Sequence, residues 1–224
     1  MNSLTTLDYY NQNAQSFATG TVSVDFHETQ DRFLKLLDKG ILVLDFGCGS
    51  GRDTKYFLEH GIHVEAIDGS EELCRIASDY AGIPVKQMLF QELKETEKYD
   101  GIWACSSILH LPKQELKAVM MKMADALKEQ GIIYTSFKYG DFEGERNGRH
   151  FTDFMEDTFR DFIADIAEIF SYIEEEPGKY LEEMPIEQAA KVVSNMDSDD
   201  AMDLFEELNE EDKYKLLKLS LIHI

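Results

Sequence analysis

A glycine-rich turn is the first feature of this 224-residue sequence that could do chemistry. Asp45-Phe46-Gly47-Cys48-Gly49-Ser50-Gly51 overlaps the end of an apolar run over 41–46. Glycines at such a turn permit a tight bend and let the main chain approach a ligand without a Cβ in the way. Taken alone, the turn is as consistent with a plain connection as with a ligand site.

Asp68 is the second feature, and it favours the ligand site. It ends the next apolar run, 62–67, seventeen residues after Gly51. A carboxylate at that place can accept hydrogen bonds from both hydroxyls of a ribose, although it could also be an ordinary acidic loop residue. In an open α/β sheet, ligands bind beyond the carboxyl ends of the strands, where the strand order reverses. The two features together predict a nucleoside site.

The residues around the turn indicate which kind of nucleoside ligand it would bind. A nucleotide-binding P-loop carries Lys and Ser or Thr after its last glycine, but Gly51 is followed by Arg52-Asp53. The dinucleotide pattern G-x-G-x-x-G is replaced here by G-x-G-x-G after Asp45. The Asp45 carboxylate would repel a pyrophosphate but suits an ammonium or a sulfonium group. S-adenosylmethionine carries both groups.

Alternating strands and helices must position these residues. Apolar runs predict strands at 41–46, 62–67, 84–89, 99–105 and 132–137, and amphipathic segments predict helices at 52–60, 70–80 and 112–129. Ser70 is the expected N-cap of the second of these helices. Strands separated by helices of this length require right-handed crossovers, so the pattern predicts an α/β fold with a doubly wound, mostly parallel sheet.

Four segments carry a resemblance to a known family: LDFGCGSGRDT (44–54), VEAIDGS (64–70), YDGIWACSSILHLP (99–112) and GIIYTSFKYGDFEGERNGRHFTDF (131–154). In this order and spacing they resemble a class I S-adenosylmethionine-dependent methyltransferase of the small bacterial type, over about residues 5–165. The resemblance implies a Rossmann-like fold, S-adenosyl-L-methionine as cofactor and methyl transfer to an acceptor, which we expect to be a small molecule. We take 1–165 as this domain.

The resemblance also implies roles for single residues. Gly47, Gly49 and Gly51 would pack against the methionine part of the cofactor, Asp68 would hold the ribose, and Met88 and Leu89 would flank the adenine. Cys105 would lie beside the cofactor, and Tyr10 belongs to a segment, Tyr9 to Phe17, that would close over the site. With Asp45, these form the predicted cofactor site. The chain departs from the family at Gln87-Met88, where an Asp often precedes the adenine-flanking residue, so recognition of the adenine amine is left open.

The acceptor side is less specific. Methyl transfer from a sulfonium is an in-line displacement, so the enzyme mainly aligns the nucleophile and excludes water. A general base is needed only when the acceptor arrives protonated; His110 is the candidate, and a histidine that merely lines the pocket is the alternative. A basic group, Lys138, Arg146, Arg149 and His150, could orient an anionic acceptor, or it could form an exposed loop balanced by Asp141, Glu143 and Glu145.

Composition limits the partners. The formal net charge of −22 argues against general nucleic-acid binding and against an anionic membrane surface. No apolar run approaches the ~20 residues that cross a bilayer, and MNSLTTLDYYNQN does not read as a signal segment, so we expect a cytoplasmic protein. The three cysteines (Cys48, Cys74, Cys105) lack a disulfide or metal pattern, and we assign no metal ligands.

The last third of the chain follows another pattern. Residues 151–224 hold 6 basic and 21 acidic side chains. Thr152–Phe170 is expected to be a helix, and Glu168–Ile173 could begin a sixth strand. A twelve-residue repeat follows, marked by Met184, Met196 and Leu208, which predicts stacked short helices. We therefore expect an acidic all-α appendage over 166–224.

This appendage carries two further resemblances. Residues ~175–218 resemble the N-domain of MgtE magnesium transporters, and 219–224 (LSLIHI) resemble a translated sequencing adapter. One hypothesis is a composite reading frame, which would leave the fifth strand with an unpaired edge; the alternative is that 218–224 forms a closing strand. For function, the alternative to a methyltransferase is a non-catalytic nucleoside-binding or regulatory module with a magnesium-transporter-like tail.

Overall fold

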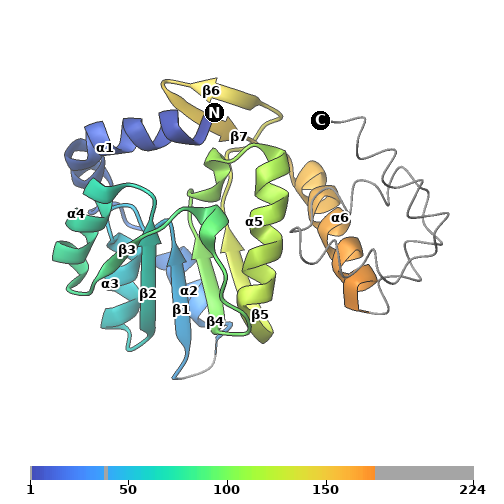
Figure 1. Ribbon diagram of the computed structural model, residues 1–224. Coiled ribbons are helices and arrows are strands. Elements are labelled where there is room, and N and C mark those ends of the chain that lie inside the picture. Colours follow the sequence, from blue (N-terminus) through green and yellow to red (C-terminus); the bar gives the residue numbers. More distant parts are fainter. Residues whose placement is uncertain (1, 38–39, 175–224) are drawn as a thin grey trace. The chain divides into compact units, whose positions relative to one another are not determined.

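The computed structural model describes residues 2–37 and 40–174. The chain divides after Thr158 into two units. The first unit contains the sheet and its helices (Figure 1). The predicted domain boundary at residue 165 stays a prediction.

Five parallel strands form the sheet of the first unit, in the order β3-β2-β1-β4-β5. They are β1 (Leu42–Phe46), β2 (His63–Asp68), β3 (Val85–Gln87), β4 (Tyr99–Ala104) and β5 (Leu127–Thr135). The order reverses between β1 and β4, so a crevice opens beyond the carboxyl ends of these two strands. The predicted α/β fold with a doubly wound parallel sheet is confirmed.

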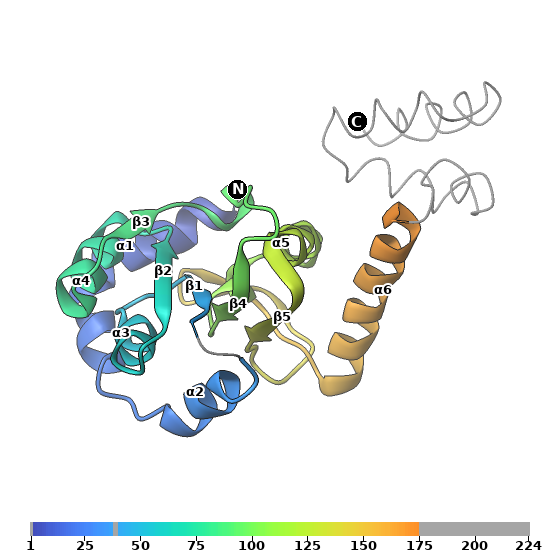
Figure 2. The ribbon, with the colours of Figure 1, turned by 90° about the horizontal axis from the view of Figure 1, so that it is seen from below.

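Helices cover both faces of this sheet. They are α2 (His27–Leu34), α3 (Arg52–Glu59), α4 (Glu71–Ala81) and α5 (Lys113–Ala126), with two short 3-10 turns, η1 (Phe90–Glu92) and η2 (Ile108–His110). Viewed along the strands, α5 lies on one face, and α2 and α3 lie on the other (Figure 2). Ser70 caps α4 as expected, because its Oγ accepts a hydrogen bond from the backbone N–H of Leu73 at 3.2 Å.

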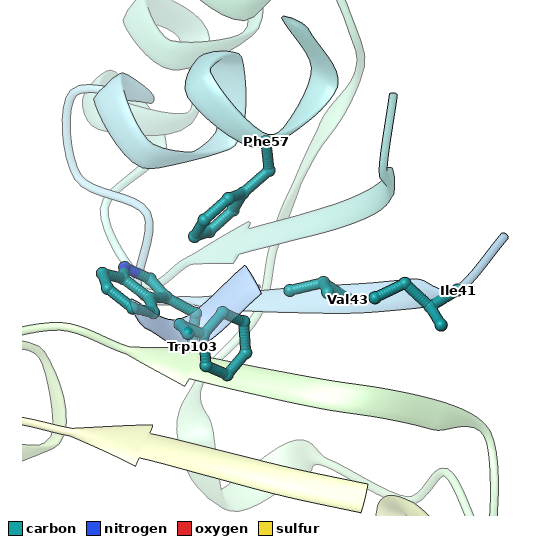
Figure 3. Packing of buried hydrophobic residues seen from close by; sticks show 5 residues of the cluster. Ile41, Val43, Phe57 and Trp103 are labelled. Atoms are coloured by element: carbon teal, nitrogen blue, oxygen red, sulfur yellow. The ribbon is translucent and has the colours of Figure 1, made fainter. Parts of the chain in front are cut away.

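An aromatic cluster fixes α2 and α3 to the sheet. Trp103 of β4 is fully buried and packs against Phe33 of α2 and Phe57 of α3, beside Val43 of β1 (Figure 3). Its indole lies parallel to the ring of Tyr134, with 3.9 Å between the centroids. Close packing of large rings leaves little room for movement, so the strands that carry the site residues have a rigid base.

A helix and a hairpin lie over the carboxyl ends of the strands (Figure 1). The helix is α1 (Asn2–Thr21), and the antiparallel hairpin is β6 (Glu143–Arg146) with β7 (Arg149–Thr152). Asn147 and Gly148 both have positive φ, which is the geometry of a type I′ hairpin turn. The backbone N–H of His150 donates to Thr6 Oγ1 at 3.0 Å and thereby ties the hairpin to α1.

Three local predictions are wrong. The helix predicted to reach Glu129 ends at Ala126, because Leu127 pairs with Tyr99 and begins β5 five residues before the predicted start. The residues after Ala126 are good helix formers, so tertiary pairing overrides their local preference. Thr152 belongs to β7, and its hydroxyl is buried against the Leu111 carbonyl oxygen, so the next helix cannot begin there.

The predicted beginning of a sixth strand at 168–173 is also wrong. Helix α6 (Glu156–Glu174) runs through these residues, with Glu156 and Asp157 in its first turn, where acids complement the helix dipole. The twelve-residue repeat, the all-α appendage beyond α6 and the proposed closing strand at 218–224 fall outside the described residues. Within the part of the chain that the structure describes, β5 pairs with β4 and has no second neighbour.

Candidate active site

A pocket of about 470 Å³ opens beyond the carboxyl ends of β1, β2 and β4. Residues of α1 line it on one side and the bend after β1 on another, and the β6–β7 hairpin contributes Arg149 and Phe151. The volume falls within the range of small-molecule sites. The pocket therefore lies where the strand order reverses, which is where the sequence predicts a ligand.

The bend after β1 presents bare main chain to this pocket at two of its glycines. Gly47 has φ +89°, and a Cβ on it would lie 2.5 Å from the Cβ of Ser107. Gly49 has φ +57°, and its Cβ would lie 3.1 Å from the ring of Phe17. Both line the pocket, and the missing side chains let Ser107 and Phe17 pack against the bend, which we call the cradle.

Gly51 has a different position from the other two glycines. Its φ is +77°, and a Cβ on it would lie 3.1 Å from the backbone of Ala77 in α4. It is the N-cap of α3 and does not line the pocket. Its smallness lets α3 begin close against α4, which supports the cradle from behind.

Asp68 joins the end of β2 to the bend. Its Oδ2 accepts a hydrogen bond from the Gly49 backbone N–H at 2.9 Å, and its Oδ1 accepts one from Ser70 at 2.8 Å. The residue lines the pocket and is 9% exposed. Burial raises the pKa of this carboxyl, opposed by the hydrogen bonds from Ser70, Gly49 and Gly69. A carboxylate has about four acceptor positions, so capacity remains for hydroxyl groups of a ligand.

Asp45 lies behind the pocket wall. It is 1% exposed, does not line the pocket and accepts a hydrogen bond from the hydroxyl of Thr54. Burial, followed by the charge of Asp53, raises the pKa of Asp45 to about 8. The side chain therefore keeps its proton to a much higher pH than an exposed aspartate does. Through Thr54 it holds the start of α3 against β1.

The residues expected to flank an adenine lie on the pocket wall. Met88 and Leu89 follow β3, and the backbone N–H of Met88 donates to the Asp68 carbonyl oxygen at 3.0 Å. Gln87 is exposed and lies outside the lining. Cys105 follows β4 and lines the same pocket; burial raises the pKa of its thiol to about 11, so it is protonated.

Tyr10 of α1 and His110 of η2 both line the pocket and contact each other there. The Tyr10 hydroxyl lies 2.8 Å from Nε2 of His110, and Nδ1 of His110 lies 2.6 Å from the His150 carbonyl oxygen. Since a carbonyl only accepts, Nδ1 carries the proton and Nε2 accepts from Tyr10. Burial lowers the pKa of His110 to about 4, helped by the charges of Arg149 and Lys138. The imidazole is neutral, and both of its nitrogens have partners.

The basic residues near the hairpin divide into separate environments. Arg146 donates to the buried carboxylate of Asp153 at 2.7 Å, and His150 is buried with Nε2 3.3 Å from the Thr152 hydroxyl. Lys138 and Arg149 instead line the pocket. Glu143 accepts from the backbone of Lys113. The four basic residues singled out in the sequence therefore do not form a single exposed loop neutralised by neighbouring acids.

Sequence reasoning did not single out Ser107 or the β6–β7 hairpin. Ser107 donates to the Phe46 carbonyl oxygen at 2.6 Å and packs against Gly47, so it shapes the bend. The hairpin had a readable signal: Asn147-Gly148 is a typical two-residue turn between strands. The position of Ser107 had none, because it depends on how β4 lies beside β1.

Among residues 2–37 and 40–174, no group of three or more His, Cys, Asp or Glu side chains could hold a metal ion. None of the helices in the same ranges is both long and apolar enough to cross a membrane.

Comparison with known proteins finds two families along the chain. Residues 43–131 match the methyltransferase domain family, and residues 163–220 match the MgtE intracellular N domain. An uncharacterized protein of Methanocaldococcus jannaschii is 31% identical over 121 residues, which cover 50% of this chain and 32% of that protein. A putative methyltransferase of Bacillus subtilis is 26% identical over 172 residues, which cover 70% of this chain and 65% of that protein. The chain thus spans less than two thirds of either relative.

Solved structures share the fold. The putative methyltransferase crystallised with the Haloferax volcanii Trm112 methyltransferase activator superposes with a TM-score of 0.59 at 19% identity, covering 71% of this chain and 75% of that one. Magnesium protoporphyrin IX methyltransferase of Synechocystis, with bound S-adenosylmethionine, gives 0.54 at 18% identity, covering 71% and 82%. At these identities the likeness establishes the architecture alone.

Proposed function

We propose that this chain, which carries a class I S-adenosylmethionine-dependent methyltransferase domain, transfers a methyl group from S-adenosyl-L-methionine to a small-molecule acceptor. One observation carries the proposal: the Gly49 backbone and the Asp68 carboxylate are hydrogen-bonded to each other on the wall of one pocket. The non-catalytic alternative is not favoured, since no observation supports it over the domain match at 43–131.

The residues present fit this cofactor. Gly47 and Gly49 line the pocket with main chain that carries no side chain, which suits the close approach of an amino-acid moiety. Asp68 retains acceptor capacity for ribose hydroxyls, and Met88 and Leu89 offer apolar surface for a base. Asp45 and Gly51 lie outside the pocket lining and hold α3 and the bend in place.

When bound, S-adenosylmethionine supplies a methyl group on a sulfonium, which an acceptor nucleophile takes in line while the C–S electron pair stays on sulfur. The chain has to orient the acceptor and exclude water. Helix α1 and the β6–β7 hairpin supply the covering surface, with Tyr10, Phe17 and Phe151 lining the pocket. Cys105 lines the pocket beyond β4.

His110 serves here as the residue that positions Tyr10 and as the candidate proton acceptor. Its Nε2 lone pair is held by the Tyr10 hydroxyl, so it becomes available only when an acceptor replaces that hydroxyl. With a pKa of about 4 it is a weak base, which suits an acceptor that arrives already deprotonated. The cytoplasmic location stays a prediction from the sequence.

Transfer of a labelled methyl group tests the proposal. The chain is incubated with S-adenosylmethionine labelled on the methyl group and a small-metabolite extract, and labelled products are separated. We expect new labelled metabolites with the wild type and with Asp79→Ala, a control at an exposed aspartate of α4. Asp68→Ala should abolish them. Absence of S-adenosylmethionine binding by the wild type in calorimetry would contradict the proposal.

A further inference from the structure

The pocket has two chemically different ends. Asp68 lies at the end formed by the bend and β2, and Arg52 and Asp53 in the lining neutralise each other through a 2.8 Å ion pair. The other end, below the β6–β7 hairpin, carries Lys138 and Arg149. The local charge there is positive, although the chain as a whole carries −22.

Lys138 and Arg149 face the same aromatic ring. Lys138 Nζ lies 5.0 Å and the Arg149 guanidinium 5.2 Å from the centroid of Phe151. Neither side chain has an acidic partner within the described ranges. Arg146 is also near Phe151, at 5.8 Å, but Asp153 neutralises it. Because two cations without counter-ions lie at one ring, binding of a negatively charged group between them is favourable.

Arg149 is held in place but is not satisfied. Its Nη1 donates to the Tyr10 hydroxyl at 3.4 Å, and its guanidinium stacks on Tyr9 with 4.4 Å to the ring centroid. Its Nε is buried without a hydrogen-bond partner. A buried N–H without an acceptor is unfavourable, and a small turn of the guanidinium toward an acceptor in the pocket would satisfy it.

From this arrangement we propose that the acceptor is a small organic acid, whose carboxylate is bound by Arg149 and Lys138 over Phe151. The planar guanidinium fork of Arg149 matches a carboxylate, and Lys138, at the exposed side of the pocket, adds a second charge. The carboxylate is bound and does not react, because pairing with two cations lowers its nucleophilicity. The methyl group goes to another atom of the same molecule.

This inference rests on the proposed function for its meaning as an acceptor site, but the anion site can be measured separately. Benzoate serves as the probe and benzamide as its uncharged counterpart of the same shape. Calorimetry is run with and without S-adenosylhomocysteine. We expect benzoate to bind at least about tenfold more tightly than benzamide. If the wild type binds benzoate but does not bind S-adenosylhomocysteine, the proposed function is contradicted and the anion site is still supported.

Variants locate the site. Lys138→Met and Arg149→Met should each weaken benzoate binding at least about tenfold and leave benzamide unchanged. Lys94→Met removes the same charge from an exposed residue outside the pocket and should have no effect. In NMR spectra, benzoate should shift the Arg149 Nε–H resonance. Equal affinity for benzoate and benzamide, no saturable benzoate binding, or unchanged binding in the Lys138 variant, which is exposed and should fold, would overturn the inference.

Discussion

The backbone N–H of Gly49 donates a 2.9 Å hydrogen bond to Oδ2 of Asp68. This bond connects the bend after β1 to the end of β2, and the backbone N–H groups of Gly47 and Cys48 add two more through the Ile67 carbonyl oxygen. The carboxylate that is proposed to hold a ribose therefore also fixes the cradle beside it. Structure and binding depend on the same side chain.

Asp68 variants should separate these two roles. Asp68→Asn keeps a carbonyl oxygen for one backbone N–H, whereas Asp68→Ala leaves both Gly49 and Ser70 without their acceptor. We expect the free energy of unfolding to fall by about 1–3 kcal/mol more for Ala than for Asn. Urea unfolding followed by the fluorescence of Trp103, the single tryptophan, measures it. Equal stability of the two variants would mean that Asp68 does not hold the bend.

Gly51 supports the cradle through close packing, and Gly82 provides a matched control. Both have φ +77°, but a Cβ at Gly51 would lie 3.1 Å from the Ala77 backbone, whereas nothing lies within 4 Å at Gly82. Gly82→Ala should cost about 1 kcal/mol from backbone strain alone. Gly51→Ala should cost about 1–3 kcal/mol more, because α3 must move from α4. Similar urea midpoints for the two variants would refute the packing role.

Asp45 should make stability depend on pH. Its pKa in the folded protein is about 8, above the ordinary value of 3.8, so the unfolded chain loses this proton first. The stabilising contribution is full below about pH 4 and is lost as the pH rises to about 8. Asp45→Asn should therefore gain stability relative to the wild type over this interval, in urea titrations at several pH values. A difference that stays constant over the whole pH range would contradict the burial argument.

His110 should remain neutral well below pH 7. Burial lowers its pKa to about 4, and its Nδ1–H is directed at the His150 carbonyl oxygen. Because the unfolded chain takes up the proton first, this residue also reduces stability as the pH falls from about 6.5 to about 4. NMR titration of the His110 imidazole resonances measures this pKa. Protonation of His110 near pH 6.5 would contradict the assigned tautomer and its hydrogen bonds.

The sheet could be predicted because its strands carry strong local signals. The apolar run ending at Phe46 and the Ser70 cap gave β1 and α4 to within a residue. The end of α5 could not be predicted, because Leu127-Lys128-Glu129 is a good helix sequence, and Leu127 pairs with Tyr99 only in the folded sheet.

Part of the candidate site could also be predicted from the sequence. Gly47, Gly49 and Asp68 follow strand ends in sequence, and strand ends of a parallel sheet meet at one edge. The position of Asp45 behind the wall could not be foreseen, because spacing does not tell on which side of a strand end a carboxylate is buried. Likewise Arg146 and Arg149 are three residues apart, yet only the hairpin register separates the paired cation from the one that lines the pocket.

The most direct measurement is an NMR titration with S-adenosylhomocysteine, in which the amide chemical shifts show where on the chain it binds. The account predicts that the largest changes occur at Gly47, Cys48, Gly49 and Gly69, beside Asp68, while the exposed turn at Gly82 stays unchanged. The changes should disappear in Asp68→Ala. Saturable shifts elsewhere that spare Gly49, or the same shifts in Asp68→Ala, would contradict the central claim.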